Sequence, residues 1–387
     1  MLLNRLRRIT TGGRWIPEID GLRFVAIFSV LLYHLSGELG TRSGRIIPVE
    51  PKYAWLGALL SYGDRGVVLF FVISGLILGL PFARHCLSAG SPVRLGKYYM
   101  RRVTRLEPPY ILAILLASLM IEVYSHPSGV AFWGHVLATI FYQHNLIYAT
   151  LSPVSAVTWS LEIEIQFYVL APLFMLVYRI SSRLYRRASI LVAILAFGLA
   201  QWPFSTSPRF ELSILFFVQY FLAGLLLADI FVLDLDRMRR SYAWDLAGVV
   251  SMAILFTAPK LNFWSHILLP FVLVVLILSA MRGRLLRSCF SNSVIAVTGG
   301  MCYSIYLMHY ICIAAIFKLT RHAIIATASF PINMAIQFLV TGLPAIALSL
   351  IFYLLVERPC MDPEWPAKLR RYLSRSSGRL DSNTTAQ

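Results

Sequence analysis

The sequence predicts an all-α integral membrane protein. Hydrophobic residues make up 58% of the 387 positions and charged residues 14%, and the mean hydropathy is +0.70. Soluble domains are nearer half apolar and a quarter charged. Apolar runs of roughly 18 residues or more recur along the chain, and each is long enough to cross a bilayer as a helix. These observations exclude an ordinary soluble enzyme, a fibrous protein and a disordered protein.

The basic residues select among these apolar runs, because Lys and Arg prefer cytoplasmic loops. If the segment 130–149 does not cross, about three quarters of the 35 Lys and Arg residues lie on one side with both termini. If it crosses, every later basic loop changes side. We therefore expect about ten transmembrane helices, cytoplasmic N- and C-termini, and one re-entrant or surface helix near 130–149. The expected spans lie near 16–37, 65–83, 106–122, 158–178, 188–204, 211–232, 243–259, 263–281, 294–318 and 332–356.

The chain is expected to comprise a basic cytoplasmic N-terminus (1–15), one transmembrane domain (16–357) and a basic cytoplasmic tail (358–387) with a disordered end. The basic loops account for the net charge of +17, so we expect membrane lipids, and not nucleic acid, around these cations. No cluster of His, Cys or Asp has the spacing of metal ligands, so no metal is expected. The sequence carries no signal for an oligomeric state.

The first expected span contains two ionisable side chains, Arg23 and His34. Their spacing corresponds to about three helical turns, which places both on one face, roughly 16 Å apart along the axis. Asp20 precedes Arg23 by one turn and can pair with it. Ionisable groups inside a bilayer are costly and are therefore functional candidates. The alternative is that Arg23 extends to the cytoplasmic interface and His34 makes a polar contact between helices.

Small and basic residues of the next spans are further candidates. Ser74 lies inside the second expected span, where a small residue ordinarily serves close packing. Arg102 and Arg105 are neighbours on a helix that enters the membrane. Guanidinium groups suit phosphate, which they bind in bidentate fashion, although any cytoplasmic anchor also has this composition.

Acidic residues and one histidine occur in the later spans. Glu164 and Tyr168 share one helix face, while Glu162 lies on another and is expected to be solvated at the interface. His309 stands in an otherwise apolar run, where a hydrogen-bonded packing role is commoner than a catalytic one. Glu357 marks the cytoplasmic end of the last span, where it can balance the neighbouring Arg358.

These side chains lie in motifs that resemble, in order, those of the acyltransferase 3 family of integral membrane acyltransferases. The resemblance runs from about residue 14 to residue 360. Ile165 replaces a commonly acidic neighbour of the family's glutamate, and Cys302 replaces a serine. The motifs are IPEIDGLRFVAIFSVLLYHL with Arg23 and His34, LFFVISGLIL at 69–78, YYMRRVTRLEPPY with Arg102 and Arg105, WSLEIEIQFY with Glu164, CYSIYLMH with His309, and ERP from Glu357.

The resemblance implies transfer of an acyl group, usually acetyl, from cytoplasmic acyl-CoA to a hydroxyl of a glycan. The acceptor would be O-antigen, capsule, exopolysaccharide or a lipid-linked sugar, and the enzyme would reside in the inner membrane of a bacterium. His34 would act as general base or as transient acyl acceptor. Arg23, with Asp20, would orient pantetheine or stabilise the oxyanion, and Glu164 would orient an imidazole or the acceptor. The donor would be bound by Arg102, Arg105 and Ser74, and further candidates are His309, Tyr168 and Glu357.

Other functions have the same overall composition. Buried Arg, His and Glu are equally typical of a proton-coupled transporter or a flippase for an anionic lipid or metabolite. Against that alternative, the sequence has no internal repeat and no matched pair of Gly- or Pro-broken helices. An accessory subunit without activity would not need the intact pairs of motif residues. A membrane transferase of another fold would not share the order of the motifs.

Overall fold

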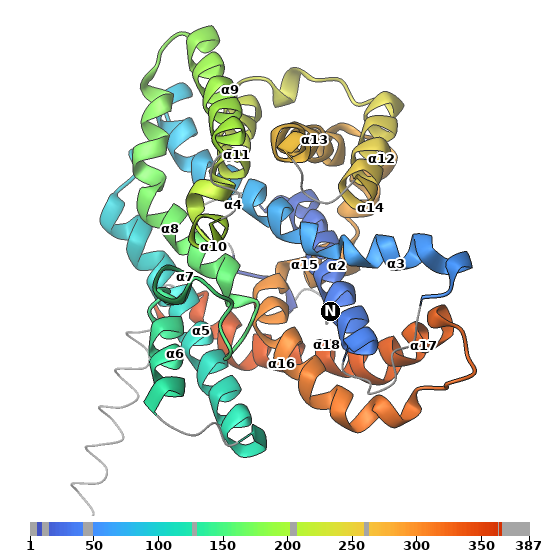
Figure 1. The fold of residues 1–387 in the computed structure, drawn as a ribbon. Coiled ribbons are helices and arrows are strands. Elements are labelled where there is room, and N and C mark those ends of the chain that lie inside the picture. Colours follow the sequence, from blue (N-terminus) through green and yellow to red (C-terminus); the bar gives the residue numbers. More distant parts are fainter. Residues whose placement is uncertain are drawn as a thin grey trace, which may run out of the picture.

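The computed structural model describes residues 6–9, 15–41, 49–125, 130–201, 207–258, 263–362 and 364–365, and every regular element in these ranges is a helix (Figure 1). Most of the predicted N-terminal region and of the tail beyond 357 lies outside the described residues. The main helices are α2 (Pro17–Thr41), α3 (Ala54–Ser61), α4 (Gly66–Leu87), α5 (Leu95–Ser125), α6 (Val130–Ile140), α7 (His144–Tyr148), α8 (Thr158–Phe174), α9 (Arg183–Ala200), α10 (Pro208–Glu211), α11 (Ile214–Leu233), α12 (Tyr242–Thr257), α13 (Phe263–Arg282), α14 (Leu285–Phe290), α15 (Ser293–Gly300), α16 (Cys302–Thr320), α17 (Phe330–Gln337) and α18 (Leu343–Phe352).

The lengths of these helices confirm the all-α membrane fold. Within the described ranges, 8 helical stretches are long and apolar enough to cross a membrane, and they begin at Pro17, Pro51, Leu95, Thr158, Pro208, Trp264, Cys302 and Phe330. The shorter helices α9 and α12, of 18 and 16 residues, correspond to the remaining two predicted spans. A π-helical segment (Phe338–Gly342) joins α17 to α18, and a second (Tyr353–Glu357) follows α18.

The segment 130–149 does not form a spanning helix, as the distribution of charge predicts. It folds as α6 and α7, which have 11 and 5 residues. Eleven residues of helix extend only about 16 Å, against roughly 30 Å of hydrocarbon. Tyr142 and Ala149 adopt left-handed φ angles of 55° and 54°, one before α7 and one after it. The chain therefore turns twice within this segment.

One predicted span is wrong in its boundaries. The run 294–318 forms two helices, α15 and α16, which are separated at Met301. The reason is the close approach of α15 to α2: a Cβ at Gly299 would lie 1.7 Å from the carbonyl oxygen of Asp20. The break also frees the first turn of α16, where the backbone N–H of Ser304 donates to the Glu357 carboxylate at 3.0 Å. Hydropathy predicts neither the close contact at Gly299 nor the hydrogen bond of Ser304.

Helix α2 lies at the centre of the assembly, with α4, α15 and α16 packed against it (Figure 1). Glycines allow the closest contacts. A Cβ at Gly21 would lie 2.2 Å from the carbonyl oxygen of Phe290, the last residue of α14. Likewise, α4 and α11 meet at Gly75 and Gly224, where a Cβ would approach backbone carbonyl oxygens to 2.2 and 2.3 Å. Small residues at such contacts let membrane helices pack backbone to backbone.

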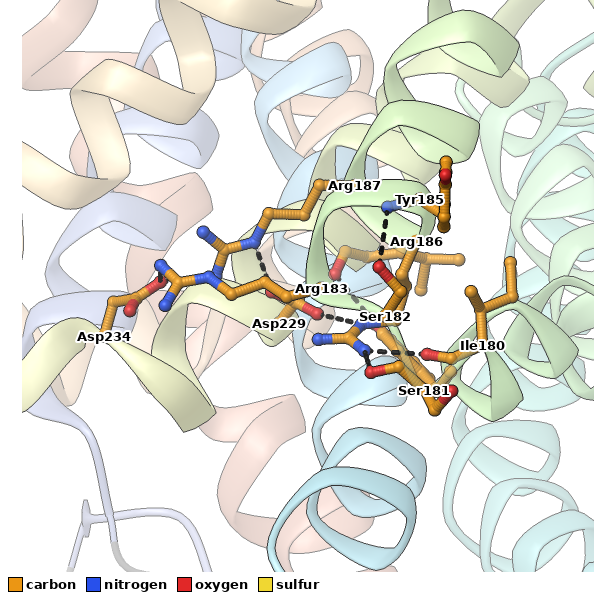
Figure 2. Close-up of polar contacts among 11 residues, drawn as sticks. Ile180, Ser181, Ser182, Arg183, Tyr185, Arg186, Arg187, Asp229 and Asp234 are labelled. Atoms are coloured by element: carbon orange, nitrogen blue, oxygen red, sulfur yellow. Dashed lines mark hydrogen bonds and ion pairs between the residues drawn. The ribbon is translucent and has the colours of Figure 1, made fainter.

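An ion-pair cluster joins α9 to α11 at one end of the bundle (Figure 2). Asp229 on α11 is fully buried, and its two carboxylate oxygens accept from Arg186 Nε at 2.5 Å and Arg187 Nε at 2.6 Å. Asp234 accepts from Arg187 and, at 2.6 Å, from Arg183. The side chain of Arg186 is itself buried and also donates to the carbonyl of Ile180. The two carboxylates therefore compensate the buried charge of Arg186 and part of the positive charge of Arg183 and Arg187.

We expect Asp229→Asn to destabilise the protein strongly, because it leaves the buried Arg186 charge uncompensated. Breaking a buried ion pair from one side costs about 3–5 kcal/mol. The melting temperature of the purified protein in detergent measures the effect. Asp236→Asn is the matched control, since Asp236 is fully exposed and lies 3.3 Å from Arg282, and it should leave the melting temperature nearly unchanged. Equal melting temperatures for both variants would contradict this account of the cluster.

Candidate functional site

Asp20 is the centre of a polar cluster at the start of α2. The carboxylate is fully buried and accepts from Arg23 Nη1 at 2.7 Å, as the one-turn spacing predicts. It also accepts from the Trp15 indole at 2.8 Å and lies 3.0 Å from Arg8 Nε. Arg7 stacks over Trp15, with its Cζ 3.6 Å from the ring centroid. The carboxylate thus joins the segment before α2 to the helix itself.

The two arginines on Asp20 leave the cluster positively charged. Burial and the neighbouring Arg23 lower the pKa of Arg8 to about 10, although Asp20 opposes that shift. A pKa near 10 still leaves Arg8 protonated at neutral pH. One carboxylate therefore faces two cations, and the surplus positive charge is available for an anion. Sequence reasoning missed Arg8 and Trp15 because both precede the motif residues of the first span.

Glu164 on α8 gathers a second set of predicted residues. Its Oε1 accepts from the hydroxyl of Tyr168 at 2.5 Å and from that of Ser74 on α4. The guanidinium of Arg102 stacks on Tyr98 at 3.6 Å and lies 5.4 Å from the ring of Tyr168. These contacts bring α4, α5 and α8 together. Ser74 therefore makes a specific hydrogen bond and does not serve packing alone.

The Asp20 and Glu164 clusters act on each other electrostatically. The charge of Glu164 interacts with Arg23 and with Arg102. Arg8 interacts with Arg105, which in turn lies 3.8 Å from Glu357. The predicted basic residues of α2 and α5 thus occupy one region of the protein. We call this region, defined by Arg8, Arg23, Arg102 and Arg105, the cationic cluster.

Glu357 makes contacts that the sequence did not predict. Besides Arg105, it binds the backbone N–H of Ser304 at 3.0 Å and the Ser304 hydroxyl at 2.6 Å, and it is fully buried. These contacts connect the end of the last span with the first turn of α16 and with α5. Glu357 therefore lies between α16 and Arg105 of the cationic cluster.

His34 and His309 form the other end of the site. Their ring centroids are 5.2 Å apart, and His34 also contacts Tyr33 and Tyr310. The Nδ1 of His309 lies 2.9 and 2.8 Å from the carbonyl oxygens of Ile305 and Tyr306, which can only accept. Nδ1 therefore carries the proton. The Nε2 atom is left with a lone pair, and this atom is buried without a hydrogen-bond partner among the described residues.

The cationic cluster and the histidine pair are separated along α2. Both Arg23 and His34 belong to this one continuous helix. Helical rise then places them roughly 16 Å apart along the axis. A ligand that contacts both the cationic cluster and the histidine pair must therefore span roughly this distance along α2.

The prediction that Glu162 is solvated at the interface is wrong. Its side chain is buried and accepts from the backbone N–H of Asn145 at 3.1 and 2.9 Å and of Leu146 at 3.4 Å. The cause is that the first N–H groups of a helix have no partner within the helix, and the carboxylate supplies one to α7. Glu162 therefore fixes the position of the short helix α7.

A comparison with known families identifies the chain. A family model described as an acyltransferase domain, of the acyltransferase 3 type, matches residues 16–354. The chain belongs to this acyltransferase family. Within the described ranges, no group of three or more His, Cys, Asp or Glu side chains is placed to hold a metal ion.

Curated relatives of the family carry the name O-acetyltransferase. A putative O-acetyltransferase of Staphylococcus aureus (strain COL) is 25% identical over 328 residues, which cover 77% of this chain and 50% of the relative. The O-acetyltransferase OatA of Staphylococcus aureus (strain NCTC 8325 / PS 47) is 25% identical over 334 residues, with the same two coverages. The chain thus spans about half the length of the curated relatives it matches. No solved structure matches it.

The α6–α7 segment contains two histidines, His135 and His144, whose contact with each other the sequence did not predict. His135 Nδ1 and His144 Nε2 are 2.9 Å apart, and His144 Nδ1 lies 3.1 Å from the carbonyl of Thr150. Since the carbonyl accepts, His144 donates from Nδ1 and accepts from His135. Burial, followed by the neighbouring His135, lowers the pKa of His144 from its usual 6.5.

We expect this pair to make the α6–α7 segment less stable in acid. Because the folded pKa of His144 is depressed, the unfolded segment binds more protons below about pH 6.5, and local stability falls as the pH decreases from that value. Hydrogen exchange of residues 130–149 at pH 7.5 and 5.5, corrected for intrinsic rates, measures the effect. His144→Asn keeps a donor for Thr150 without titrating, so it should flatten the pH dependence. Equal protection of the wild-type segment at both pH values would contradict the prediction.

Proposed function

We propose that the protein transfers an acyl group, most simply acetyl, from acyl-CoA to a hydroxyl of a cell-envelope glycan or lipid-linked sugar. The observation that carries the proposal is the arrangement on α2, with a cationic cluster at one end and a histidine pair at the other. Family membership and the relatives named O-acetyltransferases support the reaction class. A multi-pass protein of this kind would reside in the cytoplasmic membrane of a bacterium.

The cationic cluster suits the phosphates of the donor. Coenzyme A is a polyanion, and guanidinium groups form charge-assisted, bidentate hydrogen bonds with phosphate. Arg102 and Arg105 lie on α5 near the side predicted to be cytoplasmic, and Arg8 and Arg23 add positive charge beside them. Asp20 and Glu357 hold these arginines in place. We assign the phosphates to this cluster.

The separation along α2 favours one role for Arg23 over another. An oxyanion that forms next to His34 would lie roughly 16 Å along the axis from Arg23. That distance exceeds the reach of an arginine side chain, so oxyanion stabilisation by Arg23 is the less favoured role. Arg23 is better placed to orient the pantetheine arm, whose thioester then extends towards His34. The Glu164, Ser74 and Tyr168 hydrogen bonds lie between α4 and α8 and would line the same path.

The histidine pair suits activation of a hydroxyl. An imidazole is a general base near neutral pH. His34 takes the proton of the acceptor hydroxyl, the oxygen bonds to the thioester carbonyl carbon, and the C–S bond breaks. The proton then passes from His34 to the leaving CoA thiolate. The free Nε2 of His309 can accept a hydrogen bond from the His34 ring and so fix its tautomer.

A second route uses His34 as a transient acyl carrier, with the acyl group passing from sulfur to nitrogen and then to the acceptor oxygen. Labelled acetyl-CoA without acceptor separates the routes. The carrier route labels wild-type protein under rapid acid-free quench but leaves His34→Ala unlabelled. The base route labels neither protein.

The central test of the proposal is His34→Ala in lipid vesicles with labelled acetyl-CoA, with and without crude envelope glycan. We expect glycan-dependent release of CoA to fall by at least about a hundredfold, the usual contribution of a general base. Stabilisation of the protein against heat by acetyl-CoA should persist, because the donor phosphates are held elsewhere. A normal rate in this variant would overturn the role of His34.

A second prediction concerns donor binding. Arg102→Gln should raise the KM for acetyl-CoA by about tenfold or more, because it removes a charge-assisted hydrogen bond to phosphate. The kcat should change much less. Arg101→Gln is the matched control, since Arg101 is the exposed neighbour of Arg102 on α5, and it should leave both constants nearly unchanged. Equal increases of the KM in the two variants would instead attribute donor binding to the overall surface charge.

The same measurements distinguish acyl transfer from the alternative function, that of a transporter. If folded protein neither releases CoA nor gains heat stability from acetyl-CoA, the donor assignment fails. A proton-coupled carrier or flippase of another anion would then account for the buried Arg, His and Glu residues.

A further inference from the structure

A basic hollow lies at the ends of α12, α13 and α14, outside the family motifs. Its volume is about 450 Å³, and it is lined by Arg240, Gly283, Arg284, Arg287, Ser288 and Ser291. Three guanidinium groups and two hydroxyls therefore line one cavity, with no carboxylate among its lining residues. All of these residues lie between predicted spans, in the segments 233–242 and 282–293, which the distribution of Lys and Arg places on the cytoplasmic side.

The carboxylates near the hollow leave it positively charged. Glu18 of α2 pairs with Arg287 at 2.9 Å. Asp245 of α12 accepts the backbone N–H groups of Arg284, Leu285 and Leu286 at 3.0, 3.0 and 2.9 Å. Two carboxylates thus oppose three arginines, and Asp245 is engaged by the backbone of α14. The surplus charge favours an anion, and the side chains, with the serine hydroxyls, would supply its hydrogen bonds.

Large exposed apolar side chains lie on α12 and α14, the helices beside this hollow. Tyr242 and Leu246 at the start of α12 are 59% and 68% exposed, and Leu285 on α14 is 65% exposed. Arg284 lies over the ring of Tyr242 at 5.0 Å. A ligand that contacts both the cations and these side chains has a phosphate joined to a long apolar group. Free phosphate or a nucleotide would leave these apolar side chains uncovered.

We propose that this hollow binds the phosphate headgroup of an anionic phospholipid of the surrounding leaflet. The acyl chains would lie along Tyr242, Leu246 and Leu285, on the outer face of α12 and α14. Basic pockets between membrane helices on the cytoplasmic side commonly bind acidic headgroups. The lipid would connect the segment after α11, which contains Arg240, to α14, which packs against α2. This proposal does not depend on the acyl-transfer reaction.

The test uses the purified full-length protein and dioctanoyl phosphatidylglycerol below its micellar concentration. Arg240→Gln/Arg284→Gln removes two exposed cations of the hollow but leaves Arg287 and its Glu18 pair. Arg237→Gln/Arg239→Gln is the matched control, with the same change in net charge on exposed residues that do not line the hollow. Heat stability and native mass spectrometry both measure lipid binding. The melting temperature without lipid verifies folding, and the single variant Arg240→Gln is used if the double variant does not fold.

We expect the hollow variant to weaken phosphatidylglycerol binding by about thirtyfold, from the attraction of two arginines for an acidic lipid. The control pair should change it little, and dioctanoyl phosphatidylcholine should bind weakly to all three proteins. Equal weakening by both double variants would overturn the proposal in favour of general surface charge. Stabilisation by coenzyme A or inorganic phosphate that is equally strong and equally dependent on Arg240 and Arg284 would overturn the lipid assignment.

Discussion

Two arginines and a tryptophan share one buried carboxylate, that of Asp20. The rest of the site is arranged around this contact. In a bilayer such a group is tolerated only with partners, so Arg8 and Trp15 must fold back onto the start of α2. The glycine contact at Gly299 brings α15 against the same turn. The first turn of α2 is thereby fixed in position, and the helix carries that position along its axis to His34. A single electrostatic requirement thus orients the two ends of the proposed reaction path.

Acidic side chains also connect helices at other junctions of the bundle. Glu357 connects α16 and α5, Glu164 connects α4 and α8, and Asp229 connects α9 and α11. Each is an acidic side chain with a hydrogen bond or ion pair from a residue of another helix. Apolar packing cannot distinguish one neighbour from another inside lipid as strongly as it can in water, because the lipid is equally apolar. Carboxylates with defined partners therefore specify which helices meet, and glycines set how closely they approach.

The sequence was sufficient for the features that depend on one helix at a time. Most span positions, the placement of Arg23 and His34 on one continuous helix, the pairing of Asp20 with Arg23, and the non-crossing segment at 130–149 all follow from hydropathy, helical period and charge. It was insufficient wherever two distant segments meet. The bond from Ser74 to Glu164, the capping of α7 by Glu162 and the break at Met301 depend on the order of helices in the bundle. Hydropathy contains no information on that order, so Glu162 appeared solvated and 294–318 appeared continuous.

The ion pairs between α9 and α11 also constrain how the protein is made. Arg186 and Arg187 emerge from the ribosome before Asp229, their shared acceptor on a later helix. Until α11 has been synthesised, these two arginines lack their carboxylate partner, so the polar contact that fixes the start of α9 in the bundle cannot form. The final position of α9 is therefore reached only after α11 has entered the membrane. The charges of the folded protein therefore determine the order in which α9 and α11 reach their final positions.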